Sequence, residues 1–155
     1  MAEHSRFFLD KANPRVWKAL NSWAFTVSQA AEEAGVDRAV LETMYVQISQ
    51  LNGCLYCMEL HTRRAIELGV PPELLAMLSA WEESPLFTDV ERAALAIGDA
   101  VTLLPEAENR RSVLDKARAI LGDAAFGAVE WAAITMNAYN RVSIVSEHPA
   151  RNPRA

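Results

Sequence analysis

The spacing of apolar residues is the feature that most constrains the fold of this 155-residue chain. Between Asp37 and Gly53 these residues recur at steps of three and four, which matches one face of an α-helix. They are Val40, Leu41, Met44, Tyr45, Ile48 and Leu51. The pair Asn52-Gly53 is by itself a β-hairpin signal, but its helical flanks favour a helix stop at Gly53. No segment has the alternating pattern of a strand, so the sequence predicts an all-α fold.

Proline, glycine and capping residues divide this pattern into about six to seven helices. Asn13-Pro14 begins the first, and Thr88 with Glu91 forms a capping box before a later one. The predicted helices span residues 14–35, 37–52, 54–68, 71–81, 91–104, 107–121 and 123–145. The length fits a single domain over residues 1–155, with a core at about 14–145 and a flexible C-terminal tail, EHPARNPRA.

The charge balance and the hydropathy narrow the possible partners. Fifteen Lys and Arg against 20 Asp and Glu give a net charge of −5, which disfavours binding to nucleic acid or to an anionic membrane. No apolar run is long enough to span a membrane, and the N-terminus lacks an apolar signal core, so we expect a cytoplasmic protein. The helices at 91–104 and 123–145 are apolar on more than one face, which is typical of burial in a subunit interface.

The residues suited to chemistry gather in one segment, Cys54-Leu-Tyr-Cys57-Met-Glu-Leu-His61. At about 100° per residue, both cysteines and His61 fall within one sector of a helix. The helix dipole near Gly53 lowers the pKa of a nearby thiol, and His61 can accept the proton of Cys57 one turn away. In a reducing compartment, such a close pair is typical of a catalytic or metal-binding site.

Other interpretations of the two cysteines remain open. They can be two small buried hydrophobic residues. A zinc ion could be held by Cys54, Cys57, His61 and Glu42, although a structural zinc site normally has a second Cys or His pair, which is absent here. Covalent haem is excluded because Met58, and not His, follows the second cysteine. Thioredoxin-like chemistry belongs to a βαβ context, and this chain has no predicted strand.

Glu42 joins this group if the helices on either side of Asn52-Gly53 form a hairpin. Residues equidistant from the turn then face each other, which puts Glu42 within one helical turn of His61. A carboxylate in that position can orient the imidazole and raise its basicity. Alternatively, Glu42 stabilises the N-terminus of its own helix, and the spacing alone does not separate the two roles.

Two arguments disagree about which cysteine attacks a substrate. Cys57 lies four residues before His61, whereas Cys54 lies seven before it, roughly 10 Å along the helix axis, too far for direct proton transfer. Cys54 is nearer the helix N-terminus, where the dipole is worth only about 0.3–1 kcal/mol. The spacing to His61 therefore favours Cys57 as the nucleophile.

The phrase SQLNGCLYCMELHTRRA, with Glu42 twelve residues before Cys54, resembles the AhpD-like alkylhydroperoxidases of the carboxymuconolactone decarboxylase superfamily. The segments FTDVERAALAIGDAVT and MNAYNR are also similar to that family. The resemblance implies an all-α trimer or hexamer that reduces hydroperoxides without a bound organic cofactor or metal. It also implies that Cys57 attacks the peroxide, that Cys54 resolves the sulfenic acid, and that His61 and Glu42 relay protons. Tyr56 departs from the pattern, because the best-known members have a second histidine there.

The sequence thus predicts a thiol-dependent hydroperoxide reductase that acts on an organic hydroperoxide. The family resemblance suggests a dihydrolipoyl group or a small redox protein as its reductant. A general disulfide reductase or redox sensor without peroxide specificity is the alternative, and a non-catalytic helical assembly module is another. Asn137, Asn140 and Arg141 match the late family motif and are expected to cap or bridge helices.

Overall fold

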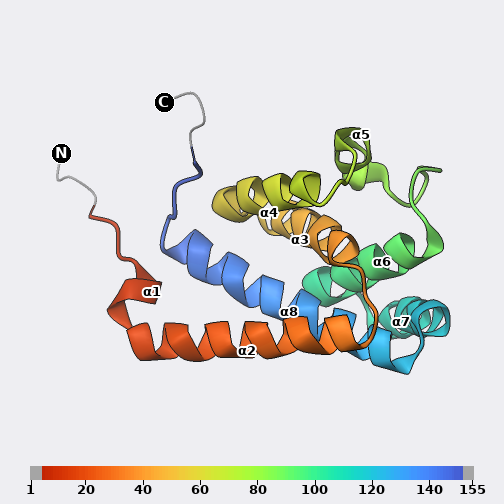
Figure 1. The fold of residues 1–155 in the computed structure, drawn as a ribbon, viewed down its shortest axis with the longest axis horizontal. Coiled ribbons are helices and arrows are strands. Elements are labelled where there is room, and N and C mark those ends of the chain that lie inside the picture. The colour runs from red at the N-terminus through yellow and green to blue at the C-terminus, as the bar shows by residue number, and fades with distance from the viewer. Residues whose placement is uncertain (1–4, 152–155) are drawn as a thin grey trace.

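The computed structural model describes residues 5–151, and within them the chain forms eight α-helices and one short 3₁₀ helix, without a strand (Figure 1). The α-helices are α1 (Leu9–Ala12), α2 (Pro14–Glu33), α3 (Arg38–Asn52), α4 (Leu55–Glu67), α5 (Pro72–Ala76), α6 (Asp89–Leu103), α7 (Ala107–Leu121) and α8 (Asp123–Val145). The 3₁₀ helix, η1, spans Leu78–Ala80. The all-α prediction is confirmed for the described part of the chain.

Local signals begin and end most of these helices where the sequence predicts. Pro14 occupies the first turn of α2, and the Asp37 side chain caps α3 by accepting from the Ala39 amide at 2.8 Å. Gly53 ends α3 with φ of 68°, a left-handed conformation that favours glycine. The capping box of Thr88 and Glu91 starts α6 at Asp89, two residues earlier than expected.

Two elements differ from the predicted helices. The helix expected at 71–81 is divided into α5 and the more tightly wound 3₁₀ helix η1, whose C-terminal end is held by contacts with α6. The Trp81 indole donates to Asp99 on α6 at 3.1 Å, and Arg92 on the same helix donates to the carbonyl oxygen of Trp81. The other difference is α1, which brings the count to eight α-helices against the six to seven predicted. Its four residues are too few to show a helical period.

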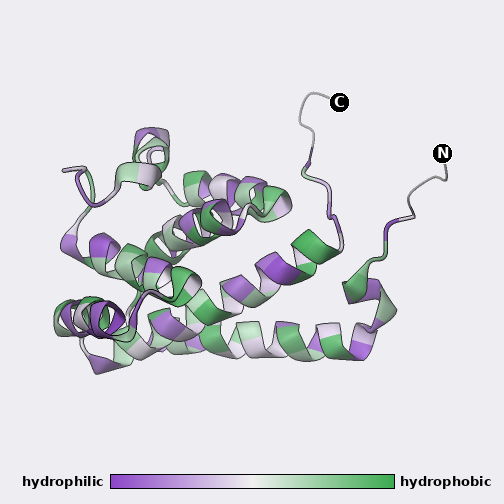
Figure 2. Cartoon of the chain, turned by 180° about the vertical axis from the view of Figure 1, so that it is seen from behind, coloured by the Kyte–Doolittle hydropathy of each residue, from purple (hydrophilic) through white to green (hydrophobic). Residues whose placement is uncertain are grey.

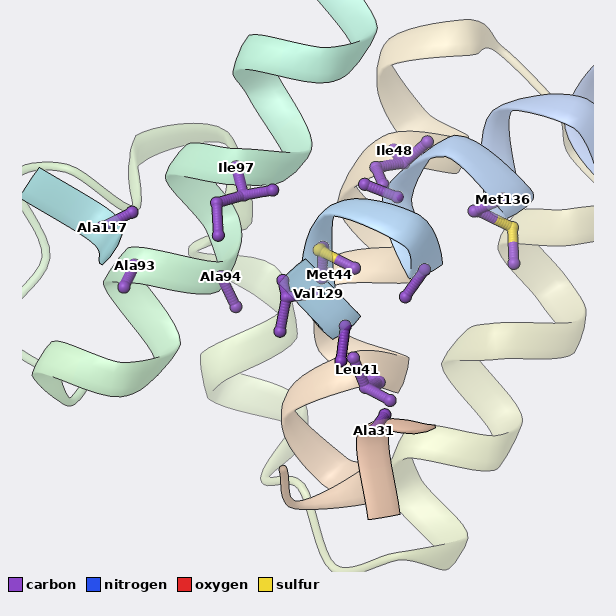
Figure 3. Packing of buried hydrophobic residues seen from close by; sticks show 13 residues of the cluster. Ala31, Leu41, Met44, Ile48, Ala93, Ala94, Ile97, Ala117, Val129 and Met136 are labelled. Atoms are coloured by element: carbon purple, nitrogen blue, oxygen red, sulfur yellow. The ribbon is translucent and has the colours of Figure 1, made fainter. Parts of the chain in front are cut away.

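The core lies where α3, α6 and α8 meet (Figure 3). Met44 and Ile48 on α3, Ile97 on α6 and Val129 on α8 are completely buried or nearly so. Gly98 on α6 lets the helices approach closely, because a Cβ there would lie 3.0 Å from the Met44 Cγ atom. This packing holds the α3–α4 hairpin, which carries the predicted site, against the rest of the bundle.

Large hydrophobic side chains remain exposed along α2 and α8. Figure 2 shows hydrophobic residues distributed along the length of both helices. Phe25 and Trp131 are 65% and 52% exposed, and Trp23 packs edge-on against Trp131. Burial of this surface between subunits would fit the predicted trimer or hexamer, which stays a prediction. None of the helices within residues 5–151 combines the length and apolarity needed to cross a membrane.

The segment after α8 contains the tail predicted to be flexible. Within it, His148 contacts Asp10 on α1 at 3.1 Å, and Ser146, which directly precedes the tail, is fully buried. Residues 152–155 of this predicted tail lie outside the described residues. A single domain over residues 1–155 stays a prediction.

Candidate active site

The two cysteines lie at the turn between α3 and α4. Cys54 is the N-cap residue of α4 and Cys57 lies in its first turn, so Cys54 is one residue outside the helix that was predicted to include it. The Cys54 amide donates to the carbonyl oxygen of Ser49 at 2.9 Å, which fixes the start of α4 against the end of α3. The cysteines are joined as a disulfide with Cα atoms 5.3 Å apart.

The two sulfur-bearing residues differ in what they face. Both are buried, at 1% exposure for Cys54 and 3% for Cys57. Cys57 lines a cavity of about 650 Å³, here called the dithiol cavity, whereas Cys54 is not among its lining residues. A molecule in this cavity therefore meets Cys57.

His61 and Glu42 form a buried pair beside the cysteines. Nδ1 of His61 lies 2.6 Å from Oε2 of Glu42, and the two side chains are 7% and 2% exposed. A carboxylate can only accept, so Nδ1 carries the proton of the neutral ring, and Nε2 is left to exchange a proton with a thiol or a ligand. The hairpin geometry expected from the sequence thus brings Glu42 and His61 together. Glu42 also lies beyond the first turn of α3, which disfavours a role at that helix terminus.

Tyr45 lies at the site, although the sequence pattern predicted it only as a core residue of α3. It lies one turn beyond Glu42, and its ring meets that of His61 edge-on at 5.2 Å. Burial, and then the charge of Glu42, raises the pKa of Tyr45 far above its usual value, so the phenol stays neutral. The sequence signal that could have predicted this role is the spacing of Tyr45, a polar aromatic residue, on the same helix face as Glu42.

A network of asparagines holds the α3–α4 turn against α8. The Asn52 side-chain amide donates to Oδ1 of both Asn137 and Asn140, each at 2.9 Å. Asn140 is fully buried and donates in turn to the Ser49 hydroxyl at 3.2 Å. Arg141 donates to Asn137 at 3.0 Å. Asn137 and Asn140 thus bridge α8 to the α3–α4 turn, as expected, and their contacts position the turn that bears Cys54. Arg141 differs from this expectation, because its bonds to Asn137 lie within α8.

The walls of the dithiol cavity come from α1, α2, α3, α4 and α8 together with the segment after α8. Tyr56 lines it and is 37% exposed. Asp10 and His148 also line it, and sequence reasoning missed both, since no local motif connects them. In the part of the chain that the structure describes, no three His, Cys, Asp or Glu side chains are arranged to hold a metal ion.

Comparison with known proteins assigns the family. The model of the carboxymuconolactone decarboxylase family matches residues 14–100, more than half of the chain, and this range includes Glu42, both cysteines and His61. The chain belongs to the carboxymuconolactone decarboxylase family. Its fold is AhpD-like, as the sequence predicts.

This carboxymuconolactone decarboxylase family protein is similar to two bacterial proteins. It is 26% identical to the uncharacterized protein YdfG of Bacillus subtilis over 113 residues, covering 73% of this chain and 77% of YdfG. It is 29% identical to the uncharacterized protein YnjA of Escherichia coli over 70 residues, 45% of this chain and 38% of YnjA.

A crystal structure of a protein of unknown function from Agrobacterium tumefaciens has the same fold. The TM-score is 0.82 at 24% identity, covering 96% of this chain and 99% of that one. The Agrobacterium protein has been suggested to be the antioxidant defence protein AhpD.

Proposed function

We propose that this protein is a thiol-dependent hydroperoxide reductase that acts on an organic hydroperoxide. The observation that carries the proposal is the position of Cys57, which is disulfide-bonded to Cys54 and faces a large cavity that the His61–Glu42 pair also lines. A redox-active dithiol needs a reactive thiolate, a second thiol and a proton acceptor, and these residues supply all three.

The proposed reaction has three steps. The reduced Cys57 gives its proton to Nε2 of His61, and the thiolate attacks the terminal oxygen of the hydroperoxide. The oxygen–oxygen bond breaks, Cys57 becomes a sulfenic acid, and the leaving alkoxide takes the proton to form an alcohol. Cys54 then attacks the Cys57 sulfur, which forms the disulfide and releases water.

In the third step an external dithiol reduces the disulfide through a mixed disulfide and leaves oxidised. The proposed reductant is a dihydrolipoyl group or a small redox protein, and the cycle needs no bound cofactor. The proposed setting is the cytoplasm, where thiols are kept reduced, and the proposed assembly is a trimer or hexamer. The family also contains decarboxylases, but a paired dithiol beside an imidazole favours redox chemistry.

The test is turnover of an organic hydroperoxide with dihydrolipoamide by the wild type, Cys57→Ser and Cys54→Ser. We expect catalysis in the wild type and none in either variant. With one equivalent of peroxide, dimedone should trap a sulfenic acid at Cys57 in the Cys54→Ser protein, and none at Cys54 in the reciprocal variant. The opposite labelling would reverse the two roles.

The same assay separates the alternative function. A wild type that is oxidised once by peroxide but does not turn over would favour the redox sensor. Reduction of general disulfides without peroxide turnover would favour the disulfide reductase.

A further inference from the structure

Four residues from distant parts of the chain meet in the wall of the dithiol cavity: Phe8, Asp10, Tyr56 and His148, here called the terminal clasp. Nε2 of His148 lies 3.1 Å from Oδ1 of Asp10. The His148 ring stacks on Phe8, with centroids 5.4 Å apart, and meets Tyr56 edge-on at 5.7 Å. Since Tyr56 precedes Cys57, the clasp lies directly beside the reactive segment.

The imidazole of His148 is fixed from both sides. Asp10 accepts from Nε2, and the Ser143 hydroxyl lies 3.3 Å from Nδ1. The backbone adds a further tie, because the Leu9 amide donates to the hydroxyl of the fully buried Ser146 at 3.0 Å. With both ring nitrogens occupied, His148 is not available as a general base. Its role is to position Phe8 and Tyr56 as a wall of the cavity.

The cavity is much larger than the smallest peroxide requires. Hydrogen peroxide is close in size to water, which occupies about 30 Å³ in the liquid, whereas the cavity has about 650 Å³. The same cavity is also lined by Trp17 and Tyr139, whose rings meet edge-on at 5.5 Å. Aromatic walls of this kind bind an apolar organic group.

We propose that the terminal clasp is the specificity-determining wall of the site, and that it selects hydroperoxides with a bulky apolar group attached to the peroxide. This inference rests on the proposed function. The organic group packs against Phe8, Tyr56 and the His148 ring while the terminal peroxide oxygen faces Cys57. His148 and Asp10 are positioning residues, since they hold the wall and take no part in proton transfer.

The test compares cumene hydroperoxide with hydrogen peroxide in the wild type, His148→Ala and Asp10→Asn. We expect His148→Ala to lower kcat/KM for cumene hydroperoxide by about 3- to 10-fold, mainly through a higher KM, because one aromatic contact surface is lost. The value for hydrogen peroxide should not change. Asp10→Asn should lower the ratio of kcat/KM for cumene hydroperoxide to kcat/KM for hydrogen peroxide as well, but by a smaller factor than His148→Ala. Asp123→Asn, which removes an exposed carboxylate bonded to Arg118 at 2.7 Å, is the matched control and should change neither value.

A binding measurement on the oxidised wild type separates this inference from the proposed function. Cumyl alcohol, the unreactive product, should bind to it by NMR titration and bind several-fold more weakly to both clasp variants. Binding with this loss, but without any peroxide turnover, would support the clasp and overturn the proposed function. The inference about the clasp is overturned if the variants turn over peroxide and kcat/KM for the two peroxides is unchanged or falls by the same factor. The proposed function would then still stand.

Discussion

Two carboxylate–imidazole pairs line the dithiol cavity, and they differ in burial and in separation along the chain. Glu42 and His61 are 19 residues apart, bond at 2.6 Å, and have side chains that are 2% and 7% exposed. Asp10 and His148 are 138 residues apart, bond at 3.1 Å, and are 17% and 16% exposed. The same two chemical groups therefore occur in two different environments of one cavity.

The difference indicates separate roles. In the inner pair Glu42 occupies only Nδ1 of His61, so Nε2 is left to exchange a proton. In the outer pair both ring nitrogens of His148 have partners. Loss of one partner from a buried pair leaves an uncompensated polar group, whereas solvent compensates a more exposed pair. The inner pair thus suits proton transfer, and the outer pair suits the positioning of neighbouring rings.

The largest effect is expected from His61→Ala. Removal of a general base should lower the rate constant of Cys57 with hydrogen peroxide by about 10²- to 10⁴-fold. Stopped-flow measurement with the reduced protein gives this value directly. His148→Ala serves as the comparison and should leave the same rate constant unchanged. A similar loss in both variants would remove the distinction between the two pairs.

Glu42→Gln should have the next largest effect. The amide still accepts from Nδ1 but carries no charge to stabilise the imidazolium, so we expect the same rate constant to fall by about 10- to 100-fold. Glu59→Gln is the matched control, because Glu59 is a carboxylate on α4 that pairs with Arg63 at 3.4 Å. If both variants react at the wild-type rate, Glu42 has no role in the relay.

Asn140→Ala tests whether the asparagine network anchors the α3–α4 turn, which lies between the helices of the inner pair. The substitution removes the two hydrogen bonds that join Asn140 to Asn52 and to the buried Ser49, which costs about 1–3 kcal/mol. Urea denaturation of the oxidised protein should show this decrease in the free energy of unfolding. Asn109→Ala on α7 is the control at a site outside the network, and a decrease of equal size there would contradict the anchoring role.

The smallest expected effect is the decrease in the free energy of unfolding caused by Asp10→Asn. Solvent and salt screen this pair more than the inner one, so we expect the free energy of unfolding to decrease by about 1 kcal/mol or less. The decrease should shrink further in 1 M salt, where the Debye length is about 3 Å. A decrease larger than that of Asn140→Ala would contradict the weak contribution expected from the outer pair.

Local spacing explains what the sequence predicted correctly. The two cysteines and His61 occupy one short segment, and helix geometry sets the position of Cys57 relative to His61 within α4. Glu42 could be placed near His61 because only one short turn, at Asn52-Gly53, separates their helices. The capping box before α6 and the stop at Gly53 are likewise properties of a few adjacent residues.

Contacts between distant segments explain what the sequence did not predict. The end of the helix expected at 71–81 bonds to α6, because the Trp81 indole donates to Asp99 and Arg92 donates to the Trp81 carbonyl oxygen, and no local pattern reveals these contacts. Tyr45 had the spacing of an ordinary core residue, and only the packing of α3 on α4 places it against His61.

The sequence by itself determined most of the helices and their ends, and the grouping of the two cysteines with His61 in one segment, because each depends on residues within a few turns of one another. Only the tertiary structure decided which cysteine faces the cavity, how the asparagines anchor the turn, and that Asp10 meets His148. Asp10 and His148 are 138 residues apart, so no helical period relates them in the sequence. They come together only because α1 and the end of α8 pack against each other.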